Sequence, residues 1–393
     1  MLAPFRQDAV LRTAAAMMLL YGATLSAMGA YLSTLGIKVF GLGEVGYAGV
    51  LVCSTLMSVT VSVLMGIRAD QTARRRGIML GSVRLTVAGF GLMVVAPGAA
   101  MFVLVHALIL PLGAAIWGQV FATARQASGA YDRVTRDSIM ATIRALFALA
   151  FVIVLPVWSV VIYAGVAVTW VYVAGLVLTG AMAWLAWRHW PRDGQAGWDD
   201  RASGLTLRAA LGELADRRVS RRLVALGAMN APMTVYLVIA GLVFAETAGR
   251  SAADTAIYVG LIAGLEVPVM LLLPRLTVGM SRTGLMLLGV GVYGCHVALL
   301  PWLAESRWVW ALTVPGAIGG AVVLLLPMAY VQDLLADRPG TGAALMALQR
   351  VIGEVLAALC FVVGTLVAGY GLVAAMAVGV ALTGAVWLWQ ADE

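Results

Sequence analysis

The stretch Ser138-Ile139-Met140-Ala141-Thr142-Ile143-Arg144-Ala145-Leu146, which continues to Pro156, places an arginine well inside an apolar run long enough to cross a bilayer. A charge at that depth costs about 2.5–3.5 kcal/mol on insertion scales, so an intramembrane arginine usually has a partner and a function. A second stretch, Leu345-Met346-Ala347-Leu348-Gln349-Arg350, repeats the pattern 206 residues later (350 − 144). The repetition predicts two related halves, each with an arginine at a matched position.

The composition is that of a helical membrane protein. Of 393 residues, 62% are hydrophobic and 11% are charged, and the mean hydropathy is +0.96, whereas soluble domains are about 45–50% apolar and 25% charged. The apolar runs are about 20 residues long, which excludes a β-barrel of alternating ten-residue segments. The net charge of +7 lies almost entirely in loops between these runs, so it indicates membrane topology rather than nucleic-acid binding.

Other features exclude several classes of site. The three cysteines each fall inside an apolar run and the three histidines are scattered, so neither a disulfide framework nor a metal site is expected. The chain has no nucleotide-binding P-loop and no motif of an intramembrane hydrolase. We therefore expect no cofactor, no use of ATP and no enzymatic activity.

Hydropathy predicts an all-α polytopic membrane protein with twelve transmembrane helices in two pseudo-symmetric six-helix bundles. The expected spans are 13–36, 45–66, 77–96, 99–122, 138–163, 168–189, 222–246, 255–274, 283–303, 308–330, 341–369 and 371–390. The one long hydrophilic segment divides the chain into an N-terminal bundle (1–190), a cytoplasmic linker (191–221) and a C-terminal bundle (222–393). From Leu205 to Val224 the linker is predicted to form an amphipathic helix on the membrane surface; alternatively, it only fixes the topology.

Basic residues set the orientation. With both termini inside, 20 of the 26 basic residues lie on the cytoplasmic side, and only Lys38, Arg250 and Arg307 lie outside. This asymmetry is the positive-inside pattern. The first apolar run is too long for a signal peptide and leads directly into further spans, so we expect an uncleaved first helix.

The two halves also match outside the arginine stretches. At an offset of 207, Arg75 and Gly77 fall on Arg282 and Gly284, while Asp70 meets Thr277. Parallel six-helix repeats related about the membrane normal are the plan of one large class of transporters.

The loop Gly66-Ile67-Arg68-Ala69-Asp70-Gln71-Thr72-Ala73-Arg74-Arg75-Arg76 resembles the loop between the second and third helices of the major facilitator superfamily. It departs from that pattern at Arg68, where a leucine is usual, and at Ala73, where a glycine is usual. The resemblance implies a cytoplasmic gate that holds the halves together when the outside is open. Its residues here are Gly66, Asp70, Arg74, Arg75 and Arg76, although the loop could be basic only for topology.

Within the superfamily, four stretches resemble the bacterial sugar efflux transporter family. They are Gln119–Arg125, Arg144–Pro156, Ala263–Pro268 and Gln332–Leu334, and Asp333 in the last of them is assigned to the gate. The resemblance implies proton-coupled efflux of a small polar solute by alternating access across a bacterial inner membrane, with a small molecule, protons and lipid as partners. A monomer is expected. Arg350 and Glu354 are not part of that family pattern.

Two ionic pairs are predicted for coupling. In the major facilitator arrangement, helices 5 and 8 face each other across the halves. From the cytoplasmic ends of these spans, Arg144 is about 9 Å deep and Glu266 about 12 Å. We expect an Arg144–Glu266 pair in some states of the cycle, unless both are fixed structural ions. Arg350 and Glu354, one helical turn apart, either neutralise each other during insertion or make Glu354 a proton carrier.

In major facilitators the cavity is lined chiefly by spans 1, 4, 7 and 10. The polar and aromatic candidates there are Tyr21, Tyr31, Trp117, Gln119, Asn230 and Tyr236. Amides donate and accept hydrogen bonds, as hydroxyl-rich ligands require, and an indole ring supplies an apolar platform. Tyr and Trp are equally common as anchors at the membrane interface.

These features together predict a proton-coupled exporter of a sugar or another small polar solute. The alternative is a multidrug efflux transporter for amphipathic compounds, which would need a more apolar cavity. A channel or an intramembrane enzyme lacks support in the sequence.

Overall fold

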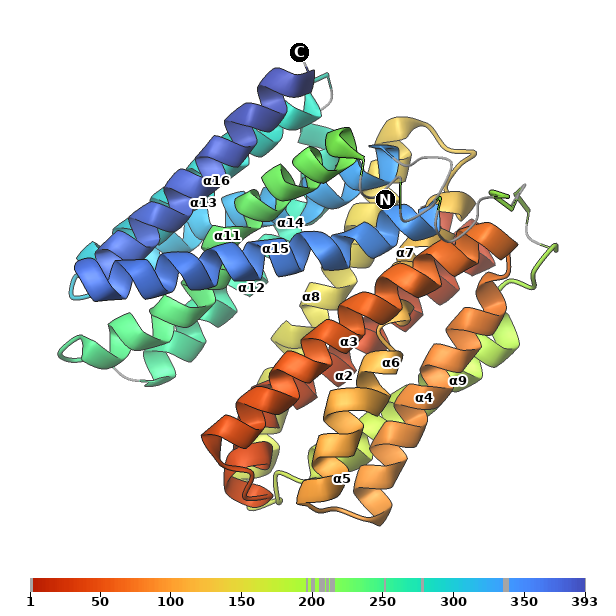
Figure 1. Cartoon of the computed structure of the whole chain (residues 1–393), viewed down its shortest axis with the longest axis horizontal. Helices are drawn as coiled ribbons and strands as arrows, with labels where there is room; N and C mark the ends of the chain where they lie inside the picture. Colours follow the sequence, from red (N-terminus) through yellow and green to blue (C-terminus); the bar gives the residue numbers. More distant parts are fainter. Residues whose placement is uncertain are drawn as a thin grey trace. The chain divides into compact units, whose positions relative to one another are not determined.

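The computed structural model describes the chain except for residues 1–2, 196, 199–201, 205–208, 210–211, 213–215, 251, 277–278, 335–338 and 393. Within the described residues, twelve helical spans are long and apolar enough to cross a membrane, which confirms the predicted number. The first six spans are formed by α2 (Ala9–Ser33), α3 (Gly43–Thr72), α4 (Arg75–Val95), the α5–η2–α6–α7 series (residues 99–127), α8 (Arg133–Tyr163) and α9 (Trp170–His189). A short α1 (Ala3–Gln7) precedes them (Figure 1).

The last six spans are formed by α11 (Arg217–Glu246), α12 (Ala252–Leu276), α13 (Arg282–Leu303), η3 with α14 (Arg307–Leu312 and Thr313–Leu334), α15 (Pro339–Val367) and α16 (Tyr370–Asp392). The chain divides into two compact units. Unit 1 comprises Met1–Leu207 and Leu334–Ala347, and unit 2 comprises Arg208–Asp333 and Leu348–Glu393.

The two units repeat one packing pattern. In unit 1 the first and third spans, α2 and α4, pack against the sixth, α9. In unit 2 the corresponding helices, α11 and α13, pack against α16 (Figure 1). The internal repeat seen in the sequence is therefore also a repeat of helix contacts.

A close helix crossing repeats as well. A methyl group on Gly22 of α2 would lie 2.7 Å from the carbonyl oxygen of Phe147 on α8. A methyl group on Gly227 of α11 would press on Ile352 of α15 and lie 3.1 Å from the Gln349 carbonyl oxygen. Small residues let transmembrane backbones approach closely, so in each unit a glycine brings the first span against the arginine-bearing fifth span.

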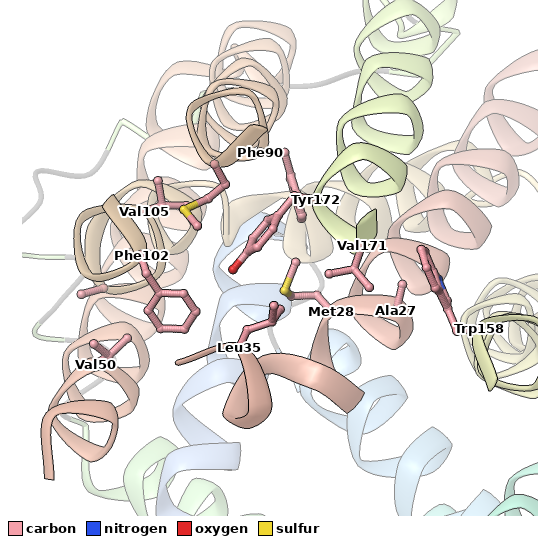
Figure 2. Close-up of a cluster of buried hydrophobic side chains, with 12 residues drawn as sticks. Ala27, Met28, Leu35, Val50, Phe90, Phe102, Val105, Trp158, Val171 and Tyr172 are labelled. Carbon is pink, nitrogen blue, oxygen red and sulfur yellow. The ribbon is translucent and has the colours of Figure 1, made fainter. Parts of the chain in front are cut away.

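The core of unit 1 is a continuous cluster of buried side chains. Met28, Phe90, Phe102 and Tyr172 are among its members and come from four different spans (Figure 2). Nearby, α2 ends in a π-helical turn, η1 (Thr34–Val39), and the fourth span contains another, η2 (Val105–Ile109), just before Pro111. A proline lacks the amide hydrogen that an α-helix needs, so it loosens the turn that precedes it.

Several helices begin earlier than hydropathy predicts. Asp132 accepts a hydrogen bond from the Thr135 amide and caps α8, and Asp216 caps α11, because an acidic side chain satisfies the first free amides of a helix. The residues from Arg217 to Val224 therefore belong to α11 rather than to a separate surface helix. Most of the predicted amphipathic segment before them lies outside the described residues.

Candidate functional site

Arg144 sits among aromatic rings in unit 1. Its guanidinium carbon lies 5.6 Å from the ring centroid of Trp117 on α7 (Ala115–Ala127) and 5.2 Å from that of Phe147, one turn further along α8. The two rings are nearly perpendicular, at 86°, with centroids 4.9 Å apart. Cation–π contact of this kind strengthens when the cation is removed from water, so the rings stabilise a charge inside a membrane span.

More rings extend this group. Phe121 contacts Trp117, and Phe151 and Tyr21 contact Phe147, with centroid separations of 4.9, 5.2 and 6.3 Å. We call Tyr21, Trp117, Phe121, Arg144, Phe147 and Phe151 the aromatic-arginine cluster. It combines ring faces for stacking with a guanidinium that donates hydrogen bonds, a combination suited to a planar or hydroxyl-bearing solute.

Of the predicted binding residues of unit 1, Tyr21 and Trp117 belong to this cluster, and both contact Phe147. Gln119 is two residues after Trp117 on α7, about 200° around the helix. It is 1% exposed, and its Oε1 has no hydrogen-bond partner among the described residues. Tyr31 packs against the core cluster of Figure 2.

Glu266 is buried in unit 2, 8% exposed. Its carboxylate lies against Gly320 of α14, where a methyl group would collide with Oε1. The same methyl group would lie 3.4 Å from the ring of Tyr293 on α13. Because Gly320 has no side chain, there is space beside α14 for the Glu266 carboxylate next to the Tyr293 ring.

Buried aromatic and imidazole rings surround this position. The Tyr236 ring on α11 lies 4.9 Å from the His296 ring on α13, and both side chains are nearly inaccessible. Tyr258 of α12 places its hydroxyl 3.2 Å from His296 Nδ1. We call Tyr236, Tyr258, Glu266, Tyr293 and His296 the histidine–tyrosine cluster.

Sequence reasoning singled out Tyr236 and Glu266 but missed His296. The sequence signal that could have identified His296 is a histidine inside an apolar run, followed by the glycine-rich span that forms α14. A methyl group on Gly316 of α14 would lie only 3.0 Å from His296 Nδ1.

The remaining candidates of unit 2 lie near the crossing of α11 and α15. Asn230 borders Gly353, where a methyl group would be 3.1 Å from the Asn230 Cβ. Arg350 Nε donates to Glu354 Oε1 at 2.8 Å, as the spacing of four residues on a helix allows. Whether this pair only neutralises charge or Glu354 carries a proton stays a prediction.

The predicted gate loop contains a buried ion pair. Arg75 donates to Asp70 Oδ1 at 2.7 Å, and the two side chains are 5% and 4% exposed. Gly66 is buried in α3, and Arg74 is exposed. Because Asp70 is in α3 and Arg75 is the first residue of α4, the pair closes the turn between these helices.

Arg76 has different partners. Its guanidinium donates to the carbonyl oxygens of Trp187 and Trp190, where α9 ends. Its backbone amide donates to Asp193 Oδ1 at 3.0 Å, and the Ser203 amide donates to the Asp70 carbonyl oxygen at 2.9 Å. The gate loop thus holds the start of the central linker within unit 1.

Unit 2 has a related but rearranged ion pair. Arg282, the repeat equivalent of Arg75, pairs with Asp333 at the end of α14. Because Thr277 stands at the position of Asp70 in the repeat, the acid comes from another helix. Nearby, Arg222 donates to Asp392 at 2.6 Å and to the Tyr330 hydroxyl at 2.7 Å.

The structure resembles solved transporters along nearly its whole length. The human organic anion transporter MFSD10 (TETRAN) matches with a TM-score of 0.74 and 15% identity, over 97% of this chain and 99% of that one. A variant of the E. coli fucose:proton symporter FucP gives 0.76 and 11%, over 96% and 98%. The major facilitator proton:xylose symporter XylE gives 0.68 and 14%, over 97% and 95%.

Sequence comparison adds nothing to these structural matches. No protein-family model matches the chain, and no curated protein matches it. At these low identities, the structural likeness establishes the arrangement of twelve helices.

Proposed function

Because this chain has the major facilitator fold, we propose that it is a secondary active transporter that works by alternating access. In this proposal it exports a sugar or another small polar solute from a bacterial cell in exchange for protons. It acts as a monomer in the inner membrane, with both termini in the cytoplasm.

The observation that carries the proposal is the aromatic-arginine cluster. An arginine inside a span is costly and is kept where it binds a substrate or a counter-ion. Here the guanidinium is braced by Trp117 and Phe147. An indole face beside hydrogen-bond donors is suited to the two sides of a sugar ring, one apolar and one hydroxyl-rich.

Proton coupling is assigned to Glu266. Its carboxylate is buried beside an aromatic ring and the glycine face of α14, and ionisable groups inside membrane spans commonly serve as proton relays. FucP and XylE are both described as proton symporters. The proposal that the solute leaves the cell while protons enter rests on the resemblance to sugar efflux transporters.

Arg144 and Glu266 are proposed to pair in part of the cycle. Arg144 belongs to unit 1 and Glu266 to unit 2. Breaking a buried pair leaves an uncompensated charge, so a pair present in only some states would bias the equilibrium between them. Protonation of Glu266 would release Arg144 and couple proton binding to opening.

The second candidate is the export of amphipathic compounds. It is favoured by the number of rings in the aromatic-arginine cluster, which offers stacking surface to an aromatic anion. MFSD10, one of the structural matches, is described as an organic anion transporter.

A thermal-shift screen of the purified protein against monosaccharides, glycosides, aromatic carboxylates and hydrophobic cations tests these functions. A ligand that binds only the folded state raises the unfolding free energy by about 2.7 kcal/mol at 100 times its Kd. We expect stabilisation by a sugar or glycoside. Stabilisation by amphipathic compounds and by no sugar would overturn the sugar proposal in favour of the second candidate.

Uptake of the stabilising solute into inside-acidic proteoliposomes, compared with vesicles lacking a pH gradient, then tests coupling. Arg144→Gln and Glu266→Gln should each abolish the response to the gradient. Arg350→Lys is the matched control, because Arg350 lies in the equivalent span and a lysine keeps the charge that faces Glu354. Equal transport with and without a gradient in the wild type would exclude proton coupling.

A further inference from the structure

His296 uses only one of its two ring nitrogens within the described chain. Nδ1 lies 3.1 Å from the Leu312 carbonyl oxygen and 3.2 Å from the Tyr258 hydroxyl. Nε2 is buried, the side chain is 0% exposed, and that nitrogen has no hydrogen-bond partner among the described residues.

The Leu312 carbonyl sets the tautomer. A carbonyl oxygen can only accept, so its contact with Nδ1 favours the neutral ring with the hydrogen on Nδ1, and Nε2 is then a lone-pair acceptor. A buried acceptor without a donor is costly, which is why nearly all such atoms in proteins are paired.

Tyr236 presents a matching group. Its side chain is 3% exposed, and its hydroxyl has no partner among the described residues. The Tyr236 and His296 rings meet at 64° with centroids 4.9 Å apart, but the hydroxyl and Nε2 do not bond to each other. A hydroxyl on α11 and a ring nitrogen on α13, each without a partner among the described residues, thus belong to two rings that are in contact.

We propose that His296 Nε2 and the Tyr236 hydroxyl together bind one hydroxyl group. The oxygen of that group accepts from the Tyr236 O–H and donates its own hydrogen to Nε2, so a single neutral O–H satisfies both side chains. A carboxylate cannot do this because it has no hydrogen to donate to Nε2. The bound hydroxyl belongs either to the transported solute or to a water molecule. The first source rests on the proposed function, and it would make the solute a neutral polyol.

The neighbouring groups leave this position to a neutral ligand. The other side of the imidazole is occupied by Tyr258 and Leu312, and the Glu266 carboxylate lies beside the Tyr293 ring and Gly320. Gly316 brings α14 against the His296 ring, which fixes the ring in place. The Glu266 carboxylate also acts electrostatically on Tyr236, so the site selects a ligand by hydrogen-bond direction and disfavours an anion.

Nitrogen-15 NMR of histidine-labelled protein tests the proposal directly. The chain has only three histidines, so His106→Gln and His189→Gln variants assign the His296 signals. We expect His296 as the neutral Nδ1–H tautomer, with an Nε2 shift characteristic of a hydrogen-bonded acceptor. In Tyr236→Phe the Nε2 signal should move to the unbonded position, whereas the matched control Tyr258→Phe should move mainly Nδ1.

D-glucose, followed by any sugar that stabilises the protein, separates the two sources of the hydroxyl. If the sugar shifts Nε2 and Tyr236→Phe weakens its binding about tenfold or more, the group belongs to the solute. If Nε2 is already bonded without sugar and does not respond to it, the group belongs to water.

The failure of this inference is distinct from the failure of the proposed function. An Nε2–H tautomer, or an unbonded Nε2 both without and with a stabilising sugar, would overturn the inference even if transport were demonstrated. If no sugar binds, the proposed function fails. The spectrum of the solute-free protein then decides this inference by itself, and an unbonded Nε2 in that spectrum would overturn it.

Discussion

The guanidinium of Arg76 binds the main-chain carbonyl of Trp190, the residue at which α9 gives way to the central linker. A residue predicted to hold the halves together thus binds the linker within its own half. This contact, with those of Trp187 and Asp193, makes the gate loop and the linker one structural element.

We expect Arg76→Ala to release the linker. Hydrogen bonds from a charged donor contribute about 1.5–3 kcal/mol each when well formed, so proteolytic cleavage within residues 190–203 should accelerate at least tenfold. Arg76→Lys should behave similarly, because a single ammonium does not reproduce the planar fork. The exposed Arg74→Ala is the control, and equal cleavage of both alanine variants would contradict this role.

Asp70→Asn should destabilise unit 1 markedly. Removing one partner of a buried ion pair leaves an uncompensated charge and costs about 3–5 kcal/mol. Asp333→Asn should cost much less, because the Asp333 side chain is 42% exposed and exposed pairs are worth about 0–1 kcal/mol. Thermal unfolding in detergent measures both. A double variant, Asp70→Asn with Arg75→Gln, should cost less than the sum of the single changes.

The sequence predicted the number of spans, and it placed most of their ends within a few residues, because an apolar run long enough for a bilayer leaves few alternatives. The end of α3, at Thr72 rather than residue 66, is the largest difference. It also placed Asp70 and Arg75 in one loop. It could not predict the partners of Arg76, which lie 111 and 114 residues away. The π-helical turns at Thr34–Val39 and Val105–Ile109 likewise depend on packing rather than on hydropathy.

The candidate site was predicted less completely. Tyr21 and Trp117 were placed on a common cavity, but the rings that brace Arg144 also include Phe147, an apolar residue indistinguishable in sequence from any lipid-facing phenylalanine. His296 was missed because its partners, Tyr258 and Leu312, come from other helices. Periodicity within one helix carries no information about such contacts.

Arg144→Lys should impair transport although it keeps the charge. A lysine lacks the flat guanidinium that stacks on Trp117 and Phe147, and loss of such contacts costs about 0.5–2 kcal/mol. We expect a roughly threefold to thirtyfold fall in solute counterflow. Arg350→Lys is the matched control and should retain most activity. Equal losses in the two variants would mean that ring stacking at Arg144 is irrelevant.

Gly319→Ala and Gly320→Ala should separate stability from activity. A methyl group at Gly319 would collide with the Tyr293 backbone, which cannot move, whereas one at Gly320 would collide with the end of the Glu266 side chain, which can. We expect Gly319→Ala to lower the unfolding free energy by about 1–3 kcal/mol. Gly320→Ala should cost less stability but should disturb the pH dependence of transport by displacing the carboxylate. Gly291→Ala, which has open space, is the control.

The cap of α8 should respond to acid. Hydrogen bonds from the Thr135 hydroxyl and amide lower the pKa of Asp132 below its ordinary value. A folded-state pKa below the unfolded one stabilises the fold above the unfolded pKa, and this stabilisation is lost as the pH falls through the folded pKa. The Asp132→Asn variant keeps a capping oxygen but does not titrate. The wild type should therefore lose its greater thermal stability, relative to this variant, below about pH 4. Parallel melting curves from pH 6 to 3 would contradict this.

The glycine face of α14 has an evolutionary consequence. Tyr293, Glu266 and His296 occupy space that exists only because Gly316, Gly319 and Gly320 have no side chains. A residue larger than glycine at one of these positions would have to share that space with the polar side chains. We therefore expect relatives with a larger residue at position 320 to lack the acid at position 266.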